Sequence, residues 1–377
     1  MSNSLREKLS LFDPDLPLEH AATVPSLWYF DSEIYAAERR AVFAGTWQVV
    51  GRSEQVAEPG SFVTADVAGE PILAVRGSDG VLRAFFNVCR HRAACVVNDA
   101  SGRATRLRCR YHGWTFDLAG RLIGTPEFDG VADFRREDNG LVPVSVDTWG
   151  PLVFVHLSEN PPPLAEFLAP MGDRAESMSL ESLRFVERRE YELRCNWKVF
   201  VDNYLDGGYH VNTVHLGLAG VLDYSQYRTE IAGNTALQTC PIQSTPSSST
   251  VQSFNCSTVS TVRTGTAYYW WVFPNFMLNA YAGVMDTNLV LPLGPDRCRV
   301  IFEFYFADTD APAARQFIAE SIAVAEQIQH EDVGICEEVQ RGLASRSFTT
   351  GRFSVRREAA GYHFHRLLAR RLAAAVT

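Results

Sequence analysis

The sequence lacks a long hydrophobic run, an excess of positive charge and an apolar N-terminus. No run reaches the 18 uncharged apolar residues of a membrane-spanning helix, and the densest aromatic run, residues 268–273, is closed by Pro274. The first residues, MSNSLREKLSLFDPDLP, place acids and prolines where a signal peptide needs an apolar core. The formal net charge of -9 argues against general nucleic-acid binding. We therefore expect a cytosolic protein with neither a membrane nor a nucleic acid as partner.

The composition is that of an ordinary globular protein. The chain has 377 residues, of which 46% are hydrophobic and 21% charged, enough for about two domains with buried cores. It contains eight cysteines. In the cytosol these are expected to be thiols or metal ligands rather than disulfides. The sequence contains no internal repeat.

Changes in the apolar period divide the chain into three parts. Residues 1–44 have a helical pattern, for which Asp31 is a suitable N-cap. Residues 45–160 contain short β-rich runs and good hairpin turns, and three consecutive prolines, residues 161–163, follow as a linker. We therefore predict a helical arm at 1–44 that packs on the last domain, a β domain at 45–160, and a further domain at 161–377.

The last part mixes strands and helices. A strand is predicted at 184–193, and several more are predicted between residues 234 and 306. Residues 311–343 have the pattern of one long amphipathic helix. The Ser/Thr-rich residues 244–266 are expected to form a long loop or an edge strand.

Two short motifs in the β domain combine cysteine with histidine. Cys89 and His91 form C-x-H, and Cys109 and His112 form C-x-x-H, both near ends of predicted strands. Two thiolates and two imidazoles are the ligands of a Rieske [2Fe–2S] cluster, with the cysteines on one iron and the histidines on the other. Structural zinc is the alternative, but zinc sites favour C-x-x-C and H-x₃₋₅-H pairs. The mixed pairs therefore favour the Rieske cluster.

A disulfide that would brace this cluster cannot form from the two motifs alone. Cys95 lies near the first motif, but Tyr111 occupies the corresponding place inside the second. The missing partner indicates a low-potential cluster of the oxygenase type.

The stretch NWKVFVDNYLDGGYHVNTVH, residues 196–215, begins as a helix and is then interrupted. Its apolar residues recur at the helical period: Trp197, Phe200, Val201, Tyr204 and Leu205. Two glycines at 207 and 208 follow, and then His210 and His215. Residues five apart do not share a face of a regular helix. The helix must therefore break or bulge for the histidines to meet, as often happens at functional sites.

Asp332 is the third candidate ligand. It falls in the middle of a helical stripe at 4-3-4-3-4 spacing, formed by Ser321, Ala325, Ile328, Asp332, Ile335 and Val339. A carboxylate in such a stripe is costly unless it is paired or binds a metal. With His210 and His215 it would complete the two-histidine, one-carboxylate set of a mononuclear iron(II) site. The alternative is a buried carboxylate bonded to Arg341 or to a tyrosine.

Two metal centres need a path for electrons. Asp206 lies just before the two glycines, where its carboxylate could bond an iron-bound histidine and, through it, a cluster histidine. Asn203, on the same helix, is a further candidate for a catalytic role.

With these motifs the chain resembles the large (alpha) subunit of Rieske non-haem iron oxygenases. Within that family it is most similar to choline monooxygenases, on three sets of segments: NWKVFVDNYLDGGYHV; PNFMLNAY with MDTNLVLPLGP; and EDVGICEEVQRGL with GYHFHRLL. The resemblance extends roughly from Trp47 to Leu368. Many members carry the bridging acid three residues before the first iron histidine. Here that position is Gly207, and Asp206 stands four before, as in choline-type sequences.

The resemblance implies an α+β protein, with an all-β Rieske [2Fe–2S] domain and a helix-grip catalytic domain in which a curved antiparallel sheet wraps around helices. It also implies a head-to-tail homotrimer in which one subunit's cluster serves the next subunit's iron. Electrons would come from NAD(P)H through a separate flavin/iron–sulfur reductase. The alternative is a pure electron carrier without oxygenase activity, but an intact set of three iron ligands argues against it.

The substrate is indicated only by aromatic residues. A quaternary ammonium group needs aromatic faces, because it cannot donate hydrogen bonds. The run TAYYWWVF and the following strand offer many rings, of which Trp271 and Tyr281 are our candidates for substrate binding. We expect monooxygenation of choline, a betaine or a similar compound, by hydroxylation or N-demethylation. Aromatic-ring hydroxylation or O-demethylation of a flat aromatic compound is the alternative.

Overall fold

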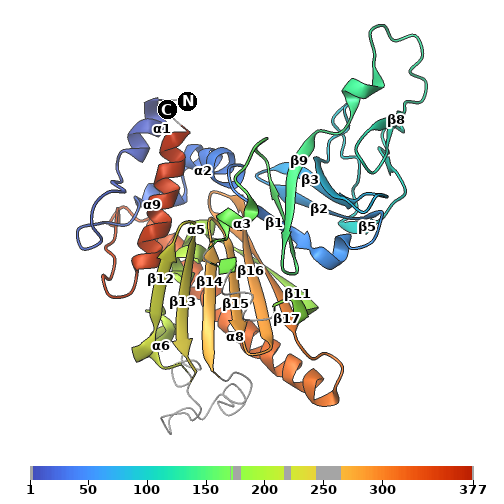
Figure 1. Cartoon of the computed structure of the whole chain (residues 1–377). Helices are drawn as coiled ribbons and strands as arrows, with labels where there is room; N and C mark the ends of the chain where they lie inside the picture. Colours follow the sequence, from blue (N-terminus) through green and yellow to red (C-terminus); the bar gives the residue numbers. More distant parts are fainter. Residues whose placement is uncertain (1–2, 170, 173–179, 216–221, 243–264, 376–377) are drawn as a thin grey trace. The chain divides into compact units, whose positions relative to one another are not determined.

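The computed structural model describes residues 3–169, 171–172, 180–215, 222–242 and 265–375, and it divides into two compact units (Figure 1). Arg39–Phe167 form the small unit, and Met1–Glu38 with Leu168–Thr377 form the large unit. The Ser/Thr-rich loop predicted at 244–266 falls almost entirely outside the described residues. Within the described residues, no helix is long and apolar enough to span a membrane.

The small unit is built from antiparallel strands. Its main sheet has the order β1-β10-β9-β4-β3-β2-β5, and a smaller sheet has the order β6-β7-β8. The bounds are β1 Gln48–Arg52, β2 Ser61–Val67, β3 Glu70–Arg76, β4 Leu82–Phe86, β5 Ser101–Arg103, β6 Leu107–Arg108, β7 Thr115–Phe116, β8 Leu122–Gly124, β9 Pro143–Trp149 and β10 Leu152–His156. Short helical turns lie at η3 Ser53–Val56, η4 Arg136–Asn139 and α3 Leu164–Phe167.

Strand β3 separates two apolar cores because successive side chains point to opposite faces. Leu73 and Val75 enter the core that also contains both cluster cysteines, whereas Ile72 and Ala74 enter the other core. A strand buried on both faces reads as a continuous apolar run, which is why the sequence PILAVR does not alternate.

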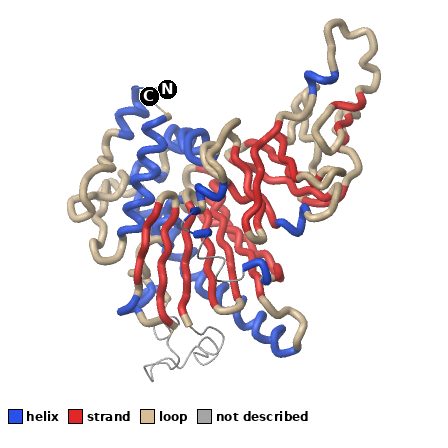
Figure 2. The backbone as a smooth tube through the Cα atoms, in the orientation of Figure 1, coloured by secondary structure: helices blue, strands red, loops and turns tan. Residues whose placement is uncertain are grey.

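The large unit contains one seven-stranded antiparallel sheet of order β11-β17-β16-β15-β14-β13-β12 (Figures 1 and 2). The bounds are β11 Arg184–Leu193, β12 Arg228–Ala232, β13 Thr235–Pro241, β14 Thr266–Val272, β15 Phe276–Tyr281, β16 Val284–Gly294 and β17 Arg297–Phe306. The helices are α1 Asn3–Leu9, α2 Ser32–Glu38, α5 Trp197–Tyr204, α6 Val211–Val214, α8 Pro312–Leu343 and α9 Ala359–Ala374, with short turns η1 Ser26–Tyr29, η5 Leu180–Ser182 and η6 Tyr224–Gln226. The curled sheet that covers helices is the arrangement expected from the sequence.

Helix α5 begins and ends for local reasons. Asn196 caps its start, because its side-chain oxygen accepts a hydrogen bond from the Lys198 amide. The helix ends before Gly207 and Gly208, whose φ angles are 70° and 72°. Only glycine adopts this left-handed region easily, and a Cβ on Gly207 would collide with the backbone carbonyl of Arg357. The interruption that the sequence predicted at the two glycines is therefore confirmed, and both histidines follow it.

Helix α8 covers the predicted residues 311–343 almost completely. The expected apolar stripe is only partly buried, because Val339 is 43% exposed while Cys336 and Gln340 are buried. A 4-3-4-3 pattern repeats every 3.5 residues, whereas a straight helix turns every 3.6. Over a long helix the two periods diverge, so the end of the predicted stripe rotates toward solvent.

The N-terminal segment is tied to helix α5. Tyr29 donates a hydrogen bond to Asp202 (2.6 Å), and Lys198 forms an ion pair with Glu38 (2.6 Å) that is completely buried. Burial raises the pKa of Glu38 and lowers the pKa of Lys198, so each charge depends on the other. Asp31 accepts hydrogen bonds from two amides of the first turn of α2, as the sequence predicted.

The unit boundaries differ slightly from those predicted. The structure places them after Glu38 and after Phe167, whereas the sequence indicated residues 44 and 160. Arg39 opens a π-helical turn, η2 Arg39–Phe43, and bonds the carbonyl of Ala68 in the small unit. The proline run also belongs there, because Trp47 donates to the carbonyl of Pro162. Side-chain contacts of this kind are not visible in composition.

Candidate metal centres

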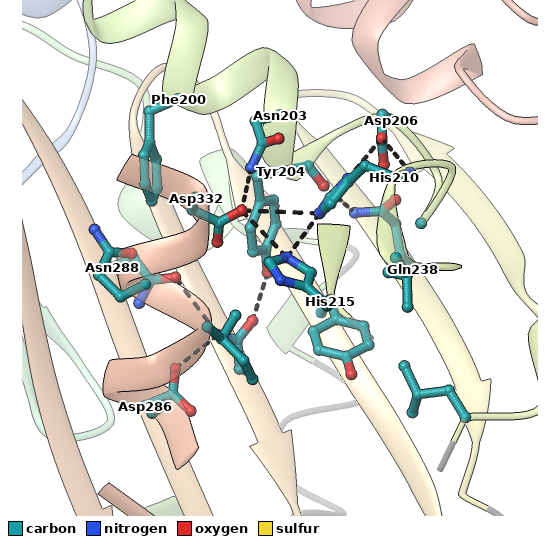
Figure 3. Close-up of a pocket in the computed structure, with 18 of the residues that line it drawn as sticks. Phe200, Asn203, Tyr204, Asp206, His210, His215, Gln238, Asp286, Asn288 and Asp332 are labelled. Carbon is teal, nitrogen blue, oxygen red and sulfur yellow. Dashed lines mark hydrogen bonds and ion pairs between the residues drawn. The ribbon is translucent and has the colours of Figure 1, made fainter. Parts of the chain in front are cut away.

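His210, His215 and Asp332 meet at one point of the large unit (Figure 3). The two imidazole Nε2 atoms are 3.0 Å apart, and Asp332 Oδ1 lies 3.2 Å from Nε2 of His215 and 3.9 Å from Nε2 of His210. Among the described residues, this is the only group of three potential ligands whose atoms all lie within 4.8 Å of one another. The spacing suits a single metal ion with two nitrogen ligands and one oxygen ligand.

The broken helix makes this convergence possible. His210 precedes the one-turn helix α6, Val211–Val214, and His215 follows it, so the two rings meet edge-on at 4.8 Å between centroids. Asp332 comes from α8 and lines the same cavity as the two histidines.

Each histidine is oriented by a carboxylate on its other nitrogen. Asp206 accepts from Nδ1 of His210 at 2.6 Å and also from its backbone amide. Glu331 Oε2 lies 2.7 Å from Nδ1 of His215. Such outer carboxylates fix the tautomer and leave Nε2 for the metal. Sequence reasoning found Asp206 but did not single out Glu331, because consecutive residues on a helix point about 100° apart and the position of Asp332 does not place its neighbour at the site.

Asn203 contacts the third ligand directly. Its Nδ2 donates to Oδ1 of Asp332 at 2.7 Å, so the amide orients the carboxylate. Within the described part of the chain, Asp332 bonds Asn203 and the two histidines, and Arg341 is exposed. Asp332 is therefore not bonded to Arg341 or to a tyrosine, the alternative partners that the sequence left open.

The electrostatics of His215 suit a place among carboxylates. Burial lowers the pKa of His215, but the bonds from Asp332 and Glu331 outweigh burial and raise it above its ordinary value. A cation is therefore stabilised at this point, whether it is a proton or a metal ion. The donor set and its convergence fit iron(II).

The four cluster residues lie in two matching turns of the small unit. Cys89 and Cys109 are buried, and each carbonyl accepts a hydrogen bond from the amide four residues later, of Ala93 or Gly113. The rings of His91 and His112 lie at the turn tips, 4.6 Å apart between centroids, and Trp114 stacks on His91.

These residues fit a two-iron group better than one zinc ion. Within the described residues, no three of the four offer ligand atoms within 4.8 Å of one another, which a tetrahedral zinc would require. Nδ1 of His91 is buried and lacks a hydrogen-bond partner, as expected of a ligand atom without its metal. Tyr111, where a second bracing cysteine would stand, is 60% exposed.

Replacing Cys109 by serine should remove the cluster. The buried thiolate would bind iron, and a serine hydroxyl is a much poorer ligand for an iron–sulfur centre. We expect the red-brown protein to lose its visible absorbance and the Rieske EPR signal of the reduced state. Cys95→Ser is the matched control and should keep both signals. A colourless wild-type protein with one zinc per chain would refute the assignment.

A cavity of about 130 Å³ adjoins the iron ligands. Its lining includes the aromatic residues Phe200, Tyr204, Tyr227, Tyr269, Tyr281 and Phe302. It also includes the polar residues Asn203, Asp206, His210, His215, Gln238, Asn279, Asp286, Asn288, Gln329 and Asp332. The remaining lining residues are Gly208, Val211, Leu222, Ala325 and Ile328. No lysine or arginine occurs among these described residues.

Three tyrosine rings form one side of this cavity. Tyr227 and Tyr269 are parallel, with centroids 6.4 Å apart, and Tyr281 meets Tyr269 edge-on at 6.1 Å. Burial raises the pKa of Tyr227 well above its usual value, so this phenol stays neutral. Tyr281 therefore lies where the sequence placed it, and Tyr227 and Tyr269 are additions that strand and loop patterns did not single out.

Trp271 does not line the cavity, and this expectation is wrong. Its ring is fully buried against Phe273 and Phe364, and its indole nitrogen donates to the carbonyl of Pro274. Tyr269 and Trp271 face the same side of strand β14, because they are two residues apart. The period fixes the face but not the position along the strand, and helix α9 covers Trp271.

Both units match known protein families. Residues 46–135 match the Rieske [2Fe-2S] domain, and residues 180–374 match the ring hydroxylating alpha subunit (catalytic domain). The second match alone covers more than half of the chain. The chain therefore belongs to the family of Rieske non-haem iron oxygenase alpha subunits, which bind a [2Fe–2S] Rieske cluster and a mononuclear iron.

Particular relatives narrow the comparison. The chain is 39% identical to choline monooxygenase, chloroplastic, of Arabidopsis thaliana, over 95% of this chain and 84% of the relative. It is 30% identical to the carnitine monooxygenase oxygenase subunit of Escherichia coli (strain K12), over 93% and 94%. The crystal structure of the quaternary ammonium Rieske monooxygenase CntA with L-carnitine superposes with a TM-score of 0.80 at 28% identity, over 95% and 97%.

Proposed function

We propose that this protein is the oxygenase component that monooxygenates an N-methylated cation, such as choline or a betaine. One observation carries the proposal: beside the iron ligands, three tyrosine rings and Asp286 line a cavity without a described lysine or arginine. Cations bind over aromatic faces and near carboxylates, whereas an anion would face these carboxylates with no lysine or arginine among the described lining residues to pair with.

The reaction follows from the two centres. When bound, the mononuclear iron would supply O₂ activation, and the Rieske cluster, a one-electron carrier, would pass on one at a time the two electrons that the reaction takes from the reductase. One oxygen atom enters a C–H bond next to oxygen or nitrogen, and the other leaves as water with two protons. Oxidation beside a hydroxyl group gives an aldehyde hydrate, whereas oxidation of an N-methyl group gives demethylation with formaldehyde.

The chain's own residues orient the ligands and carry the electron path. Asp206 and Glu331 hold the two imidazoles, and Asn203 holds Asp332. We assign Asp206 the role of the bridge between His210 and a cluster histidine. In a head-to-tail homotrimer that histidine belongs to a neighbouring subunit. Inter-subunit electron transfer in a similar quaternary ammonium Rieske monooxygenase supports such an assembly.

Electrons are proposed to come from NAD(P)H through a separate flavin/iron–sulfur reductase. The name of the carnitine relative, an oxygenase subunit, supports a system of several components. The described cysteines are all free thiols, which agrees with a reducing compartment such as the cytoplasm.

A substrate panel tests the function. Choline, glycine betaine, stachydrine and carnitine are compared with benzoate, salicylate and vanillate, by substrate-dependent O₂ uptake and product identification. We expect oxidised products only from cations. Tyr281→Leu should raise KM for the cation by less than about 30-fold, because one cation–π contact contributes about 0.5–2 kcal/mol. Tyr281→Phe keeps the ring and is the matched control.

Two outcomes would contradict the proposal. Products from the aromatic acids alone would make the protein an aromatic-ring or O-methyl oxygenase. Two irons per chain instead of three, with no O₂ uptake on any substrate, would make it an electron carrier.

A further inference from the structure

The amide of Gln329 lines the cavity and has no hydrogen-bond partner among the described residues. Its side chain is buried, with the residue 1% exposed, and neither Nε2 nor Oε1 is bonded. Asn288, 3% exposed, also lines the cavity, and its Nδ2 is unbonded too. Buried amide atoms are nearly always paired in folded proteins. Gln329 and Asn288, here called the amide pair, therefore offer two donors and one acceptor group to a ligand.

The amide pair borders the iron ligands. Gln329 precedes Asp332 by three residues on helix α8, so both side chains lie on one face, about one turn apart. Asn288 lies two residues after Asp286 on strand β16, so these two share a face of the sheet (Figure 3). A ligand group held by the amide pair is thus near the metal and also within the same cavity as the tyrosine rings.

The charge around this cavity is negative. Asp206, Asp286 and Asp332 line it, and Glu331 lies directly behind His215. These four carboxylates outnumber the two positive charges of an iron(II). A substrate carboxylate would lose its water and face other carboxylates, with no described guanidinium or ammonium to pair with.

Hydrogen-bond chemistry points the same way. A carboxylate only accepts hydrogen bonds, so it would leave Oε1 of Gln329 without a partner. A hydroxyl group both donates and accepts, so it can satisfy Oε1 of Gln329 together with one amide nitrogen. We propose that the amide pair binds an uncharged hydroxyl group, and that the enzyme therefore selects cationic amino alcohols over zwitterionic betaines. This inference rests on the proposed function.

Three ligands of similar size test the selection in the wild-type holoenzyme. Choline carries the hydroxyl group, ethyltrimethylammonium lacks it, and glycine betaine replaces it with a carboxylate. Binding is measured by anaerobic calorimetry, and kcat/KM is measured by O₂ uptake. We expect choline to bind at least about tenfold more tightly than either analogue, because a site built for a hydroxyl rejects ligands that leave its polar groups unpaired.

A substitution at Gln329 tests whether this residue causes the preference for the hydroxyl group. Gln329→Met keeps the length of the side chain and removes the amide, so choline should bind about tenfold more weakly while ethyltrimethylammonium changes by less than about threefold. Gln316→Met on the exposed face of the same helix is the matched control. Iron content and circular dichroism report whether each variant is folded. If Gln329→Met does not fold, the comparison of the three ligands on the wild-type holoenzyme decides whether the enzyme selects the hydroxyl group.

The outcomes separate this inference from the function itself. Equal or tighter binding of glycine betaine overturns the inference but leaves a cation oxygenase in place. If Gln329→Met weakens the binding of all three ligands equally, the inference is also overturned, because the amide then has a structural or solvent-binding role and does not recognise the hydroxyl group. Failure of every cation to bind or react contradicts the proposed function.

Discussion

Asp332→Ala should yield a protein that retains its Rieske cluster but has lost its mononuclear iron and all turnover. Asp332 supplies the only oxygen ligand that meets both imidazoles within the described residues. Without it two neutral nitrogens remain, and they hold iron(II) far more weakly. The loss should exceed the roughly 10–100-fold that outer partners of metal ligands cost. Iron analysis should fall from three to two irons per chain, and the cluster EPR signal should be unchanged.

The control for this variant is Glu338→Ala, an exposed acid on the same helix. It should keep three irons and full turnover. Substrate oxidation at the normal rate in Asp332→Ala would show that the third ligand lies elsewhere in the chain.

Asp206→Asn should leave both metals bound but stop electrons from passing between them. The carboxylate accepts from His210 at Nδ1 and at its backbone amide, so it fixes the imidazole that faces the iron. An asparagine of the same shape keeps one acceptor oxygen but loses the charge. We expect reoxidation of the reduced cluster, followed by stopped-flow absorbance after adding substrate and O₂, to slow by about 100-fold.

Asp202→Asn is the matched control for this experiment, because Asp202 lies one helical turn earlier and bonds Tyr29 and His365 rather than His210. Its cluster should reoxidise at close to the wild-type rate. Normal reoxidation in Asp206→Asn would exclude an essential charged bridge.

The candidate metal ligands could be singled out from the sequence because metal-binding chemistry restricts residue type and spacing, and the structure brings His210, His215 and Asp332 together. Two mixed Cys/His pairs have few structural explanations, and the two glycines at 207 and 208 indicated where a helix must end. Asp332 was recognisable because a carboxylate in an apolar stripe needs a partner. The strands of the large unit followed from the residue patterns, and their antiparallel sheet followed from the family resemblance.

The partners of those ligands were harder to predict. Glu331 reaches His215 across 116 residues of sequence, and nothing local distinguishes it from an ordinary surface acid. Trp271 shows a second limit, since alternation assigned the correct face of β14 but not the helix above it. Gln329 follows Ile328 of the predicted stripe and was not singled out, because its burial depends on how far α8 rotates over 32 residues.

The close approach of Gly207 to Arg357 sets an order of events during synthesis. The histidine segment leaves the ribosome about 150 residues before Arg357, whose carbonyl packs against Gly207. Two hydrogen bonds of helix α5 also need residues that are made much later. Asp202 bonds His365, 163 residues further on, and Asn203 bonds Asp332, 129 residues further on. Domains fold as they emerge, so the Arg39–Phe167 unit can acquire its cluster while translation continues. The contacts around the mononuclear site can form only after nearly all of the chain has been made, so this site is completed after the residues of the Arg39–Phe167 unit are available.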